Sequence, residues 1–386
     1  MLSCQKHLFS LDEDWHYINC AYMSPLLRSA EQAGKDGLMK KRNPVNVRPE
    51  DFFNDGSEVR ALFAGLVKAD KDRIALIPSA SYGLGIVIQN IKPAKGGRVV
   101  TVHEEFPSDV YSLHRICSDH QLELVTVQPP EDLNGRGRKW NERILDAITP
   151  NTSLVNLSSV HWADGTIFDL EAIGKRAKEV GALFVVDGTQ SVGAMKVDVS
   201  RYHIDALICA GYKWLLGPYT SGMAFLGEYF DDGRPLEETW LNRLGSENFR
   251  GLVDYQPLYH PKASRYNMGE CSNFINLPMQ KAALAQILEW TPDAISAYCS
   301  QLTAPLVEYL TANGFWLEQE AYRAKHLFGF RLPGHLNIEA VQQELLKKKV
   351  VVSLRGNAVR VSPHVYNDHR DMQALTDALS ILKHTD

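Results

Sequence analysis

Two short stretches of the sequence place chemically reactive side chains close behind apolar runs. In ALFVVDGTQSVG (182–193), Asp187 ends a run of Leu, Phe and Val, and Gln190 follows three residues later. In AGYKWLLGPYTSG (210–222), Lys213 comes soon after the apolar run DALICA. Because buried parallel strands end at the crevice where open α/β sheets bind their ligands, these side chains are candidates for chemistry. Each alone also has an ordinary explanation, Asp187 as a helix cap and Lys213 as a side chain that reaches solvent.

The surroundings of Lys213 indicate what this chemistry is. Tyr212, Trp214 and two leucines flank the lysine, and a lysine that is kept away from water loses its proton more readily. The neutral amine is a nucleophile that forms a Schiff base with an aldehyde, and pyridoxal 5'-phosphate is such an aldehyde. This cofactor also requires an acid for its pyridine nitrogen and a donor for its ring oxygen, roles that suit Asp187 and Gln190.

The remaining requirements are a ring that stacks on the cofactor and groups that bind its phosphate. Phe106, in VHEEFPSDVYS, follows another predicted strand and is a candidate for stacking, although a core phenylalanine at a helix entry explains it equally well. Ala80 and Ser81, in IPSASYGLG, stand at the start of a predicted helix, where free N–H groups and the helix dipole favour phosphate. The same stretch is a poor dinucleotide-binding fingerprint, because Ile88 occupies the place of the third glycine.

Taken together, VVDGTQSVG and the later YKWLLGP resemble the class V aminotransferases. This family of fold-type I pyridoxal-phosphate enzymes includes cysteine desulfurases, kynureninase and isopenicillin N epimerase, and the similarity extends over nearly the whole chain. The other similar segments are INCAYMSP (18–25), which resembles the family's N-terminal segment along the active site, RYNMGECSNF (265–274), which resembles the stretch that reaches the partner subunit's phosphate, and RGNAVRVSPHVYND (355–368), which resembles the substrate-binding segment. The resemblance implies a homodimer with the active site at the subunit interface.

The resemblance also assigns a role to each candidate residue. It implies that Lys213 forms the Schiff base, that Asp187 partners the pyridine nitrogen and that Gln190 donates to the ring oxygen. The other implied roles are stacking for Phe106, phosphate binding for Ala80, Ser81 and the Tyr212 hydroxyl, a clamp on the substrate carboxylate for Arg360, and a second substrate anion for Arg355.

The chain departs from the family pattern at positions that narrow its activity. A desulfurase needs a nucleophilic cysteine in the loop before Arg360, but the last cysteine here is Cys299, far upstream. Residues 210–212 replace the usual Ser-x-His before the lysine, and Phe106 stands where many members stack a histidine. Both changes favour the kynureninase-like and epimerase-like branch over persulfide chemistry.

Two further departures affect contacts with the cofactor. Glu270 takes a position often held by a phosphate-binding threonine, so Ser272 becomes the candidate for that cofactor contact. Trp162, in SVHWADG, stands where a polar residue often contacts the cofactor, and we expect it to shape the pocket instead.

The order of the predicted elements indicates the fold. Apolar helical stretches alternate with short strands as far as DALICA (205–210), which favours a mostly parallel sheet between helices. The clearest helix is DLEAIGKRAKEVG (169–181), with Asp169 as its N-cap and Gly181 at its end. Near Pro278 the pattern changes to a long helical region followed by short strands and helices. We predict an α/β protein of the fold-type I class with a seven-stranded type of sheet, divided into an N-terminal arm (1–20), a large cofactor-binding domain (21–276) and a small α+β domain (277–386).

Composition limits the possible classes of function. The chain of 386 residues is 45% hydrophobic and 23% charged, and its net charge of −5 arises from interspersed acidic and basic residues. We therefore expect a soluble globular protein with no nucleic-acid footprint and no basic membrane patch. The six cysteines are scattered without a metal-binding spacing, and the first residues lack a signal-peptide pattern. These features predict reduced thiols, no metal and a cytoplasmic location.

The sequence thus predicts an enzyme that uses pyridoxal 5'-phosphate and acts on an amino acid, with amino transfer as the favoured reaction. A lyase of the kynureninase-like or C–S kind and an epimerase are the alternatives, because the orientation of the reacting bonds decides among these outcomes. A nicotinamide-dependent oxidoreductase and a catalytically silent binding protein are less favoured.

Overall fold

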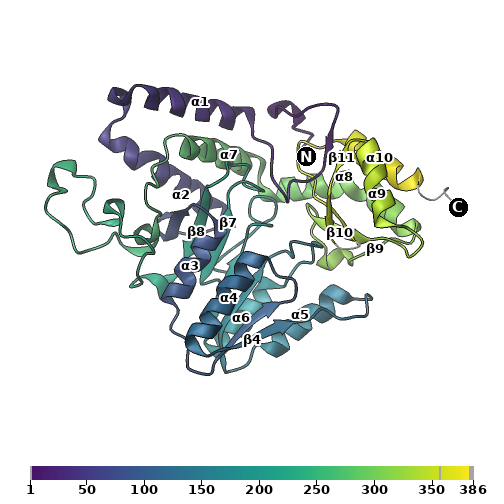
Figure 1. Ribbon diagram of the computed structural model, residues 1–386, viewed down its shortest axis with the longest axis horizontal. Helices are drawn as coiled ribbons and strands as arrows, with labels where there is room; N and C mark the ends of the chain where they lie inside the picture. The colour runs from purple at the N-terminus through teal and green to yellow at the C-terminus, as the bar shows by residue number, and fades with distance from the viewer. Residues whose placement is uncertain (1, 356–357, 382–386) are drawn as a thin grey trace.

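The computed structural model describes residues 2–355 and 358–381 (Figure 1). The α-helices are α1 (Arg28–Arg42), α2 (Asn54–Val67), α3 (Ala80–Asn90), α4 (Pro107–His120), α5 (Arg136–Ala147), α6 (Leu170–Val180), α7 (Asn276–Trp290), α8 (Pro292–Ala312), α9 (Ile338–Lys347) and α10 (His369–Ile381). The strands are β1 (His16–Tyr17), β2 (Ile74–Ile77), β3 (Arg98–Val102), β4 (Glu123–Val127), β5 (Thr152–Ser158), β6 (Leu183–Asp187), β7 (Ala206–Ala210), β8 (Gly222–Leu226), β9 (Trp316–Leu317), β10 (Phe328–Arg331), β11 (Val350–Val351), β12 (Ser353–Arg355) and β13 (Ala358–Val361).

A seven-stranded sheet forms the centre of the molecule, in the order β2-β8-β7-β6-β5-β3-β4. The strands from β7 to β4 pair in parallel, while β8 is antiparallel to both of its neighbours. This arrangement confirms the predicted α/β fold with a mostly parallel sheet. The sequence pattern did not predict β8, which follows the glycine-containing turn after Lys213.

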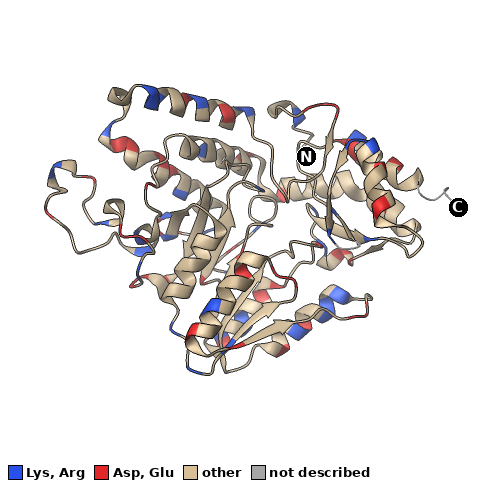
Figure 2. Cartoon of the chain, viewed as in Figure 1, with Lys and Arg blue, Asp and Glu red and all other residues tan. Residues whose placement is uncertain are grey.

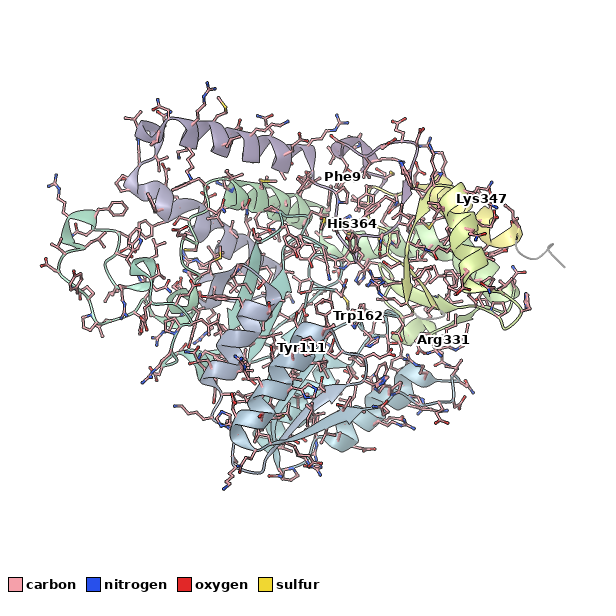
Figure 3. The ribbon with its side chains drawn as sticks, in the orientation of Figure 1. Phe9, Tyr111, Trp162, Arg331, Lys347 and His364 are labelled. Carbon is pink, nitrogen blue, oxygen red and sulfur yellow. The ribbon has the colours of Figure 1, made fainter. Side chains whose placement is uncertain are left out.

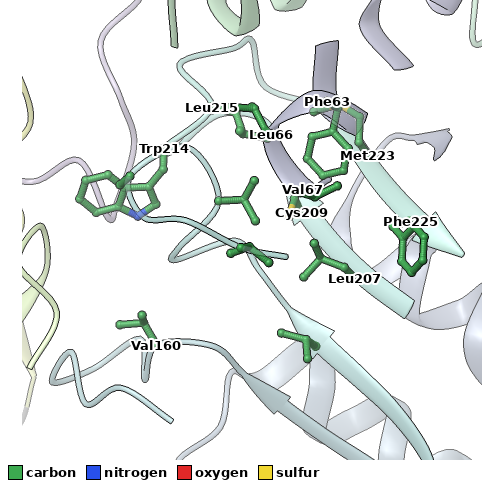
Figure 4. Packing of buried hydrophobic residues seen from close by; sticks show 14 of the residues in the cluster. Phe63, Leu66, Val67, Val160, Leu207, Cys209, Trp214, Leu215, Met223 and Phe225 are labelled. Carbon is green, nitrogen blue, oxygen red and sulfur yellow. The ribbon is translucent and has the colours of Figure 1, made fainter. Parts of the chain in front are cut away.

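Helices cover both faces of this sheet and create two apolar layers. Residues of α3 and α4 pack on one face, and residues of α2, α5, α6 and α7 pack on the other. Figure 4 shows part of the second layer, where Phe63, Leu66 and Val67 of α2 lie near Leu207 of β7 and Met223 of β8. Burial on both faces explains why the central strands are continuously apolar rather than alternating.

Local signals set the ends of several helices. The Asp169 carboxylate accepts a hydrogen bond from the Ala172 N–H (3.0 Å), and Gly181 ends α6 in the left-handed conformation, as predicted. Helix α5 begins at Arg136 after Gly135, which has a left-handed conformation. The long helical region after Pro278 consists of α7 and α8, which are separated at Thr291.

The C-terminal part of the chain forms a smaller sheet, which lies at the right in Figure 1. Its order is β12-β13-β10-β9, and all pairs are antiparallel. Apolar residues of α8, α9 and α10 pack with those of β10 and β13 in one core. The N-terminal arm joins this part because β1 pairs with β11 (His16↔Val350). The boundaries of the three predicted domains, at residues 20 and 276, stay a prediction. Residues 356–357, which belong to the predicted substrate-binding segment 355–368, lie outside the described residues.

The described surface carries mixed charge. In Figure 2, basic and acidic residues are interspersed along α1 and on the C-terminal helices. Within residues 2–355 and 358–381, none of the helices has the length and hydropathy needed to cross a bilayer, and no three His, Cys, Asp or Glu side chains gather as a metal site would require.

Candidate active site

The site forms where β6 and β7 end side by side. The two strands are parallel, with Asp187 opposite Ile208, so their carboxyl ends meet at one edge of the sheet. The Gly188 N–H donates to the Ile208 carbonyl (2.8 Å), and the Ala210 N–H donates to the Thr189 hydroxyl (3.1 Å). These bonds tie together the loops that carry Asp187 and Lys213.

Gly193 allows the same two loops to pack closely. Its φ is +100°, which is rare for other residues, and a Cβ atom at this position would collide with the backbone oxygen of Trp214. A side chain at Gly193 would therefore displace the loop next to Lys213.

A cavity of about 450 Å³ lies at this edge of the sheet, a size that suits a cofactor and a small substrate. The predicted residues that line it are Ala80, Ser81, Phe106, Trp162, Asp187, Gln190, Tyr212 and Lys213. The fold thus brings together side chains that come from five separate segments of the sequence.

Lys213 is nearly removed from solvent, with 7% of its surface exposed. Its Nζ lies 5.4 Å from the centre of the Phe106 ring and 5.6 Å from that of Tyr212. Burial, with help from the charges of Arg360 and Arg355, lowers the pKa of Lys213 to about 8, while the carboxylate of Asp187 opposes this shift. At pH 7, roughly one in ten such amines is neutral, against fewer than about one in a thousand for an ordinary lysine.

This pKa predicts the pH dependence of cofactor attachment. In the protein freed of cofactor, Lys213 should react with pyridoxal 5'-phosphate faster as the pH rises through about 8, because only the neutral amine attacks the aldehyde. Asp187→Asn should move this midpoint to lower pH, since the Asp187 charge favours the ammonium form. Stopped-flow absorbance measures both rates. A midpoint near the ordinary lysine value of 10.5 would contradict the burial of Lys213.

Asp187 and Gln190 lie at the floor of the cavity. Asp187 is 5% exposed, and one carboxylate oxygen accepts a hydrogen bond from the Thr189 N–H (2.8 Å). The Gln190 side chain donates to the Ala21 carbonyl (3.2 Å) and accepts from the indole N–H of Trp214 (2.8 Å). Gln190 is therefore held in place by the N-terminal segment and by the residue after Lys213.

The N-terminus of α3 opens on the same cavity. The Ser79 hydroxyl caps α3 by accepting from the Tyr82 N–H (3.2 Å), and it lies 3.1 Å from the Ser81 hydroxyl. Tyr212 packs on Tyr219, with ring centres 4.6 Å apart. Helix N–H groups and hydroxyls that converge in this way suit a phosphate group.

Two arginines approach the cavity from the small sheet. Arg360 of β13 is 1% exposed, and its guanidinium donates to the Trp162 carbonyl (2.7 Å) and the Ser353 hydroxyl (3.1 Å). Arg355 lies over the Trp162 ring, 5.3 Å from its centre. Trp162 also meets Phe106 edge to face, with ring centres 5.7 Å apart, and Figure 3 shows Trp162 between the large and small parts of the chain. Trp162 therefore shapes the cavity on the side from which the arginines approach.

The positive charge of these arginines is not neutralised locally. Burial, followed by repulsion from Arg355, lowers the pKa of Arg360 to about 10. Burial also lowers the pKa of Arg355. Among the described residues, neither guanidinium forms an ion pair with a carboxylate. The two guanidinium groups therefore carry positive charge beside Trp162 without a carboxylate partner among the described residues.

Comparison with known proteins identifies the family. Residues 42–376 match the family described as aminotransferase class-V. The chain belongs to the class V aminotransferase family. It is 28% identical to an uncharacterised aminotransferase of Bacillus subtilis (strain 168), with 82% of this chain and 81% of that protein covered. It is 24% identical to isopenicillin N epimerase of Amycolatopsis lactamdurans, with 84% of each chain covered.

The fold is shared with solved structures of more distant sequence. The apo structure of a cysteine desulfurase from Thermococcus onnurineus NA1 superposes with a TM-score of 0.84 at 21% identity and covers 99% of both chains. A cystine C–S lyase in complex with its product cysteine persulfide has the same TM-score at 18% identity, covering 96% of this chain and 98% of that one. These likenesses confirm the fold-type I architecture.

As a class V aminotransferase family member, the protein is an enzyme whose cofactor is pyridoxal 5'-phosphate. The cavity fits this group. It offers a desolvated amine on Lys213, a carboxylate on Asp187 and a helix N-terminus with the Ser81 hydroxyl, and these groups match an aldehyde, a basic ring nitrogen and a phosphate.

Three predicted residues, Ser272, Arg355 and Arg360, do not line the cavity, and several residues that do line it were not predicted. Ser272 borders a different cavity together with Glu270, and its hydroxyl donates to the Phe52 carbonyl. Ser158 and Thr189 line the main cavity but were not predicted. Ser158 ends β5, opposite Asp187, so the rule that drew attention to Asp187 would also have found it. Thr189 was not predicted because it lies in the short turn between Asp187 and Gln190, and only those two residues of the turn were assigned a role from the sequence.

Proposed function

We propose that this enzyme is an aminotransferase of α-amino acids in which Lys213 both attaches the cofactor and moves the α-proton of the substrate. The observation that carries the proposal is the placement of Lys213. This buried lysine, with a lowered pKa, shares one cavity with Asp187 and lies within electrostatic reach of Arg360. A lysine that is partly neutral at physiological pH is suited to accept and return a proton.

The other cavity residues bind and orient the cofactor in this proposal. Bound pyridoxal 5'-phosphate supplies an electron sink for negative charge at the substrate α-carbon. The Asp187 carboxylate would pair with the pyridine nitrogen and favour its protonated form, and Gln190 would donate to the ring oxygen. The Phe106 ring stacks on the cofactor. The groups that hold the phosphate are the N-terminus of α3 at Ala80 and Ser81 and the Tyr212 hydroxyl.

Arg360 is the proposed ligand of the substrate α-carboxylate. A guanidinium binds a carboxylate through two parallel hydrogen bonds, and burial makes each of them stronger. Arg355, which lies over the Trp162 ring, adds a second cation that would receive a second anionic group of the substrate. The proposal therefore favours amino acids with an acidic side chain over neutral ones.

The cysteines of the chain support amino transfer over desulfuration. Cys20 contacts the site, with its sulfur 3.9 Å from the backbone oxygen of Lys213. Its thiol is fully buried, and burial strongly raises its pKa, so it carries neither the exposure nor the charge of a sulfur nucleophile. A lyase of the kynureninase-like or C–S kind, or an epimerase, would use the same lysine and carboxylate, and product analysis distinguishes these reactions.

We propose further that the enzyme is a homodimer. The segment between β8 and α7 projects from the body at the left of Figure 1. Its large apolar side chains that are exposed are Tyr229, Leu236, Trp240, Leu244, Leu252, Val253, Tyr255 and Leu258. Monomers rarely expose so many apolar side chains on one segment. Ser272 borders a cavity with Trp240 of this segment, which supports a contact between Ser272 and the partner's cofactor.

Light scattering during gel filtration tests the dimer. The double variant Val253→Asp, Tyr255→Asp should halve the measured molecular mass.

We also propose that the enzyme is located in the cytoplasm, since all six cysteines are free thiols. Cell fractionation checks this location.

The reaction itself is tested by mixing stoichiometric holoenzyme with single ¹⁵N-labelled amino acids. Amino transfer predicts that the label moves to the cofactor while an equal amount of the intact 2-oxo acid forms, both measured by mass spectrometry. A cleaved carbon fragment with unlabelled cofactor would indicate a lyase, and inversion without any oxo acid would indicate an epimerase. Either result would overturn the proposed amino transfer.

A further inference from the structure

A second aspartate lies behind Asp187. Asp109, in the first turn of α4, is fully buried (0% exposed) and does not line the cavity. The face of the sheet that α4 covers also carries Thr101 of β3, Asn156 of β5 and Asp187 of β6. Side chains two positions apart in a strand point to the same face, and the residues two positions earlier (Val99, Leu154 and Val185) pack in the core beneath α3 and α4. Asp109 therefore enters a small polar cluster on the opposite side of Asp187 from solvent.

The hydrogen bonds of this cluster are incomplete when Asp109 is treated as a carboxylate. Within the described residues, both oxygens of Asp109, the side-chain oxygen of Asn156 and the hydroxyl of Thr101 have no hydrogen-bond partner. Three of these atoms are acceptors, the Thr101 hydroxyl is both donor and acceptor, and the Asn156 amide N–H lies 3.5 Å from the Val185 carbonyl. Because buried polar atoms in folded proteins are almost always hydrogen-bonded, the cluster lacks a donor. A proton on Asp109 supplies one.

Both neighbouring acids accept hydrogen bonds from N–H or hydroxyl groups, which favours Asp109 as the acid that holds the proton. Glu105 accepts hydrogen bonds from the Phe106 N–H (2.8 Å), the Ser158 N–H (2.7 Å) and the Ser158 hydroxyl (2.5 Å). Asp187 accepts one from the Thr189 N–H (2.8 Å). Neither oxygen of Asp109 has a described partner at ordinary hydrogen-bond geometry, and the side chains that interact with it are those of Asn156 and Asp187.

Electrostatics agree with this assignment. Burial raises the pKa of Asp109 well above its usual value, and the negative charges of Asp187 and Glu105 raise it further. A hydrogen bond from the Asn156 side chain opposes the shift, and so does the N-terminus of α4, which carries only roughly half an elementary charge. Burial and the two acidic neighbours together outweigh both opposing effects.

We propose that Asp109 is a positioning residue that stays protonated at neutral pH and donates a hydrogen bond to Asp187. This bond fixes the orientation of the Asp187 carboxylate and leaves the negative charge on the aspartate that faces the cavity. The inference rests on the role proposed above for Asp187 as the partner of the pyridine nitrogen. It adds a residue that never touches the cofactor but determines how firmly Asp187 is held toward it.

Infrared spectroscopy tests the protonation state directly. The difference spectrum of wild type minus Asp109→Asn should contain the carbonyl stretching band of a protonated carboxylic acid at neutral and mildly alkaline pH, in cofactor-free protein as well as in holoenzyme. Asp119→Asn, on the exposed surface near the end of α4, is the matched control and should show no such band. A wild-type spectrum without this band overturns the proposal. Since the measurement needs neither cofactor nor substrate, failure of the proposed amino transfer would not affect it.

Cofactor affinity tests the positioning role. Asn is nearly isosteric with a neutral Asp and keeps a donor, so Asp109→Asn should leave the Kd for pyridoxal 5'-phosphate within about threefold of wild type. Asp109→Leu has no donor and should weaken binding about 10- to 100-fold. Quenching of tryptophan fluorescence measures the Kd, and circular dichroism checks folding. If Asp109→Asn weakens binding as much as Asp109→Leu, or if Asp109→Leu binds as wild type does, the positioning role is wrong. If Asp109→Leu fails to fold, the Asn variant and the infrared band decide.

Discussion

Lys213→Ala is expected to remove the covalent link between protein and cofactor and to lower kcat by about 10²- to 10⁴-fold, the range typical of losing a positioned acid–base group. The reason is that one buried amine serves two purposes, as the nucleophile for the aldehyde and as the proton carrier. Borohydride reduction followed by peptide mass spectrometry measures the link, and steady-state kinetics with the best amino-acid substrate measures the rate.

Lys175→Ala is the matched control, because Lys175 is an exposed lysine of α6. It should retain both the reducible link and the activity of wild type. A small added amine should restore part of the proton-transfer rate of Lys213→Ala without restoring the link to the protein. If the Lys213 variant still yields a cofactor-modified peptide after reduction, another lysine carries the cofactor and the assignment fails.

The sequence could predict the residues that follow the central strands, because their position depends on local pattern alone. β6 and β7 read as continuous apolar runs since both faces of the sheet are covered, and their ends place Asp187 and the loop of Lys213 at one edge. Gln190 follows from Asp187 by a short turn. The start of α3 was predictable from the strand-to-helix change at Ser79. These elements required no knowledge of how distant segments pack.

Features that depend on long-range packing could not be predicted. An aspartate at the start of a helix is usually a solvated N-terminal residue, and only the docking of α4 on the sheet buries Asp109. The contact of Arg360 with the Trp162 backbone depends on how the small sheet meets the large one. Ser272 was assigned to the cofactor by resemblance, yet within one chain it borders another cavity.

Arg360→Leu is expected to lower kcat/KM for amino acids by about 30-fold or more, mainly through KM. The loss corresponds to at least about 2 kcal/mol, the lower end for truncating one partner of a buried charged pair. The buried guanidinium lacks a carboxylate among the described residues, so a substrate carboxylate would complete its hydrogen bonds. Arg360→Lys keeps a charge but loses the two-pronged geometry, and it should fall between wild type and Arg360→Leu. Kinetics across a series of amino acids measures these effects.

Arg355→Leu separates the two arginines. Arg355 is only half-buried and lies on the Trp162 ring, so its loss should leave neutral amino acids within about twofold of wild type, given that an exposed pair contributes roughly 0–1 kcal/mol. For substrates with a second acid group, the same variant should lower kcat/KM by a larger factor. If Arg355→Leu lowers kcat/KM equally for neutral and acidic amino acids, Arg355 does not bind a second acid group of the substrate. If Arg360→Leu leaves kcat/KM unchanged, another residue binds the substrate carboxylate. The ratio of the two classes of substrate in the two variants therefore decides which arginine binds which end of the amino acid.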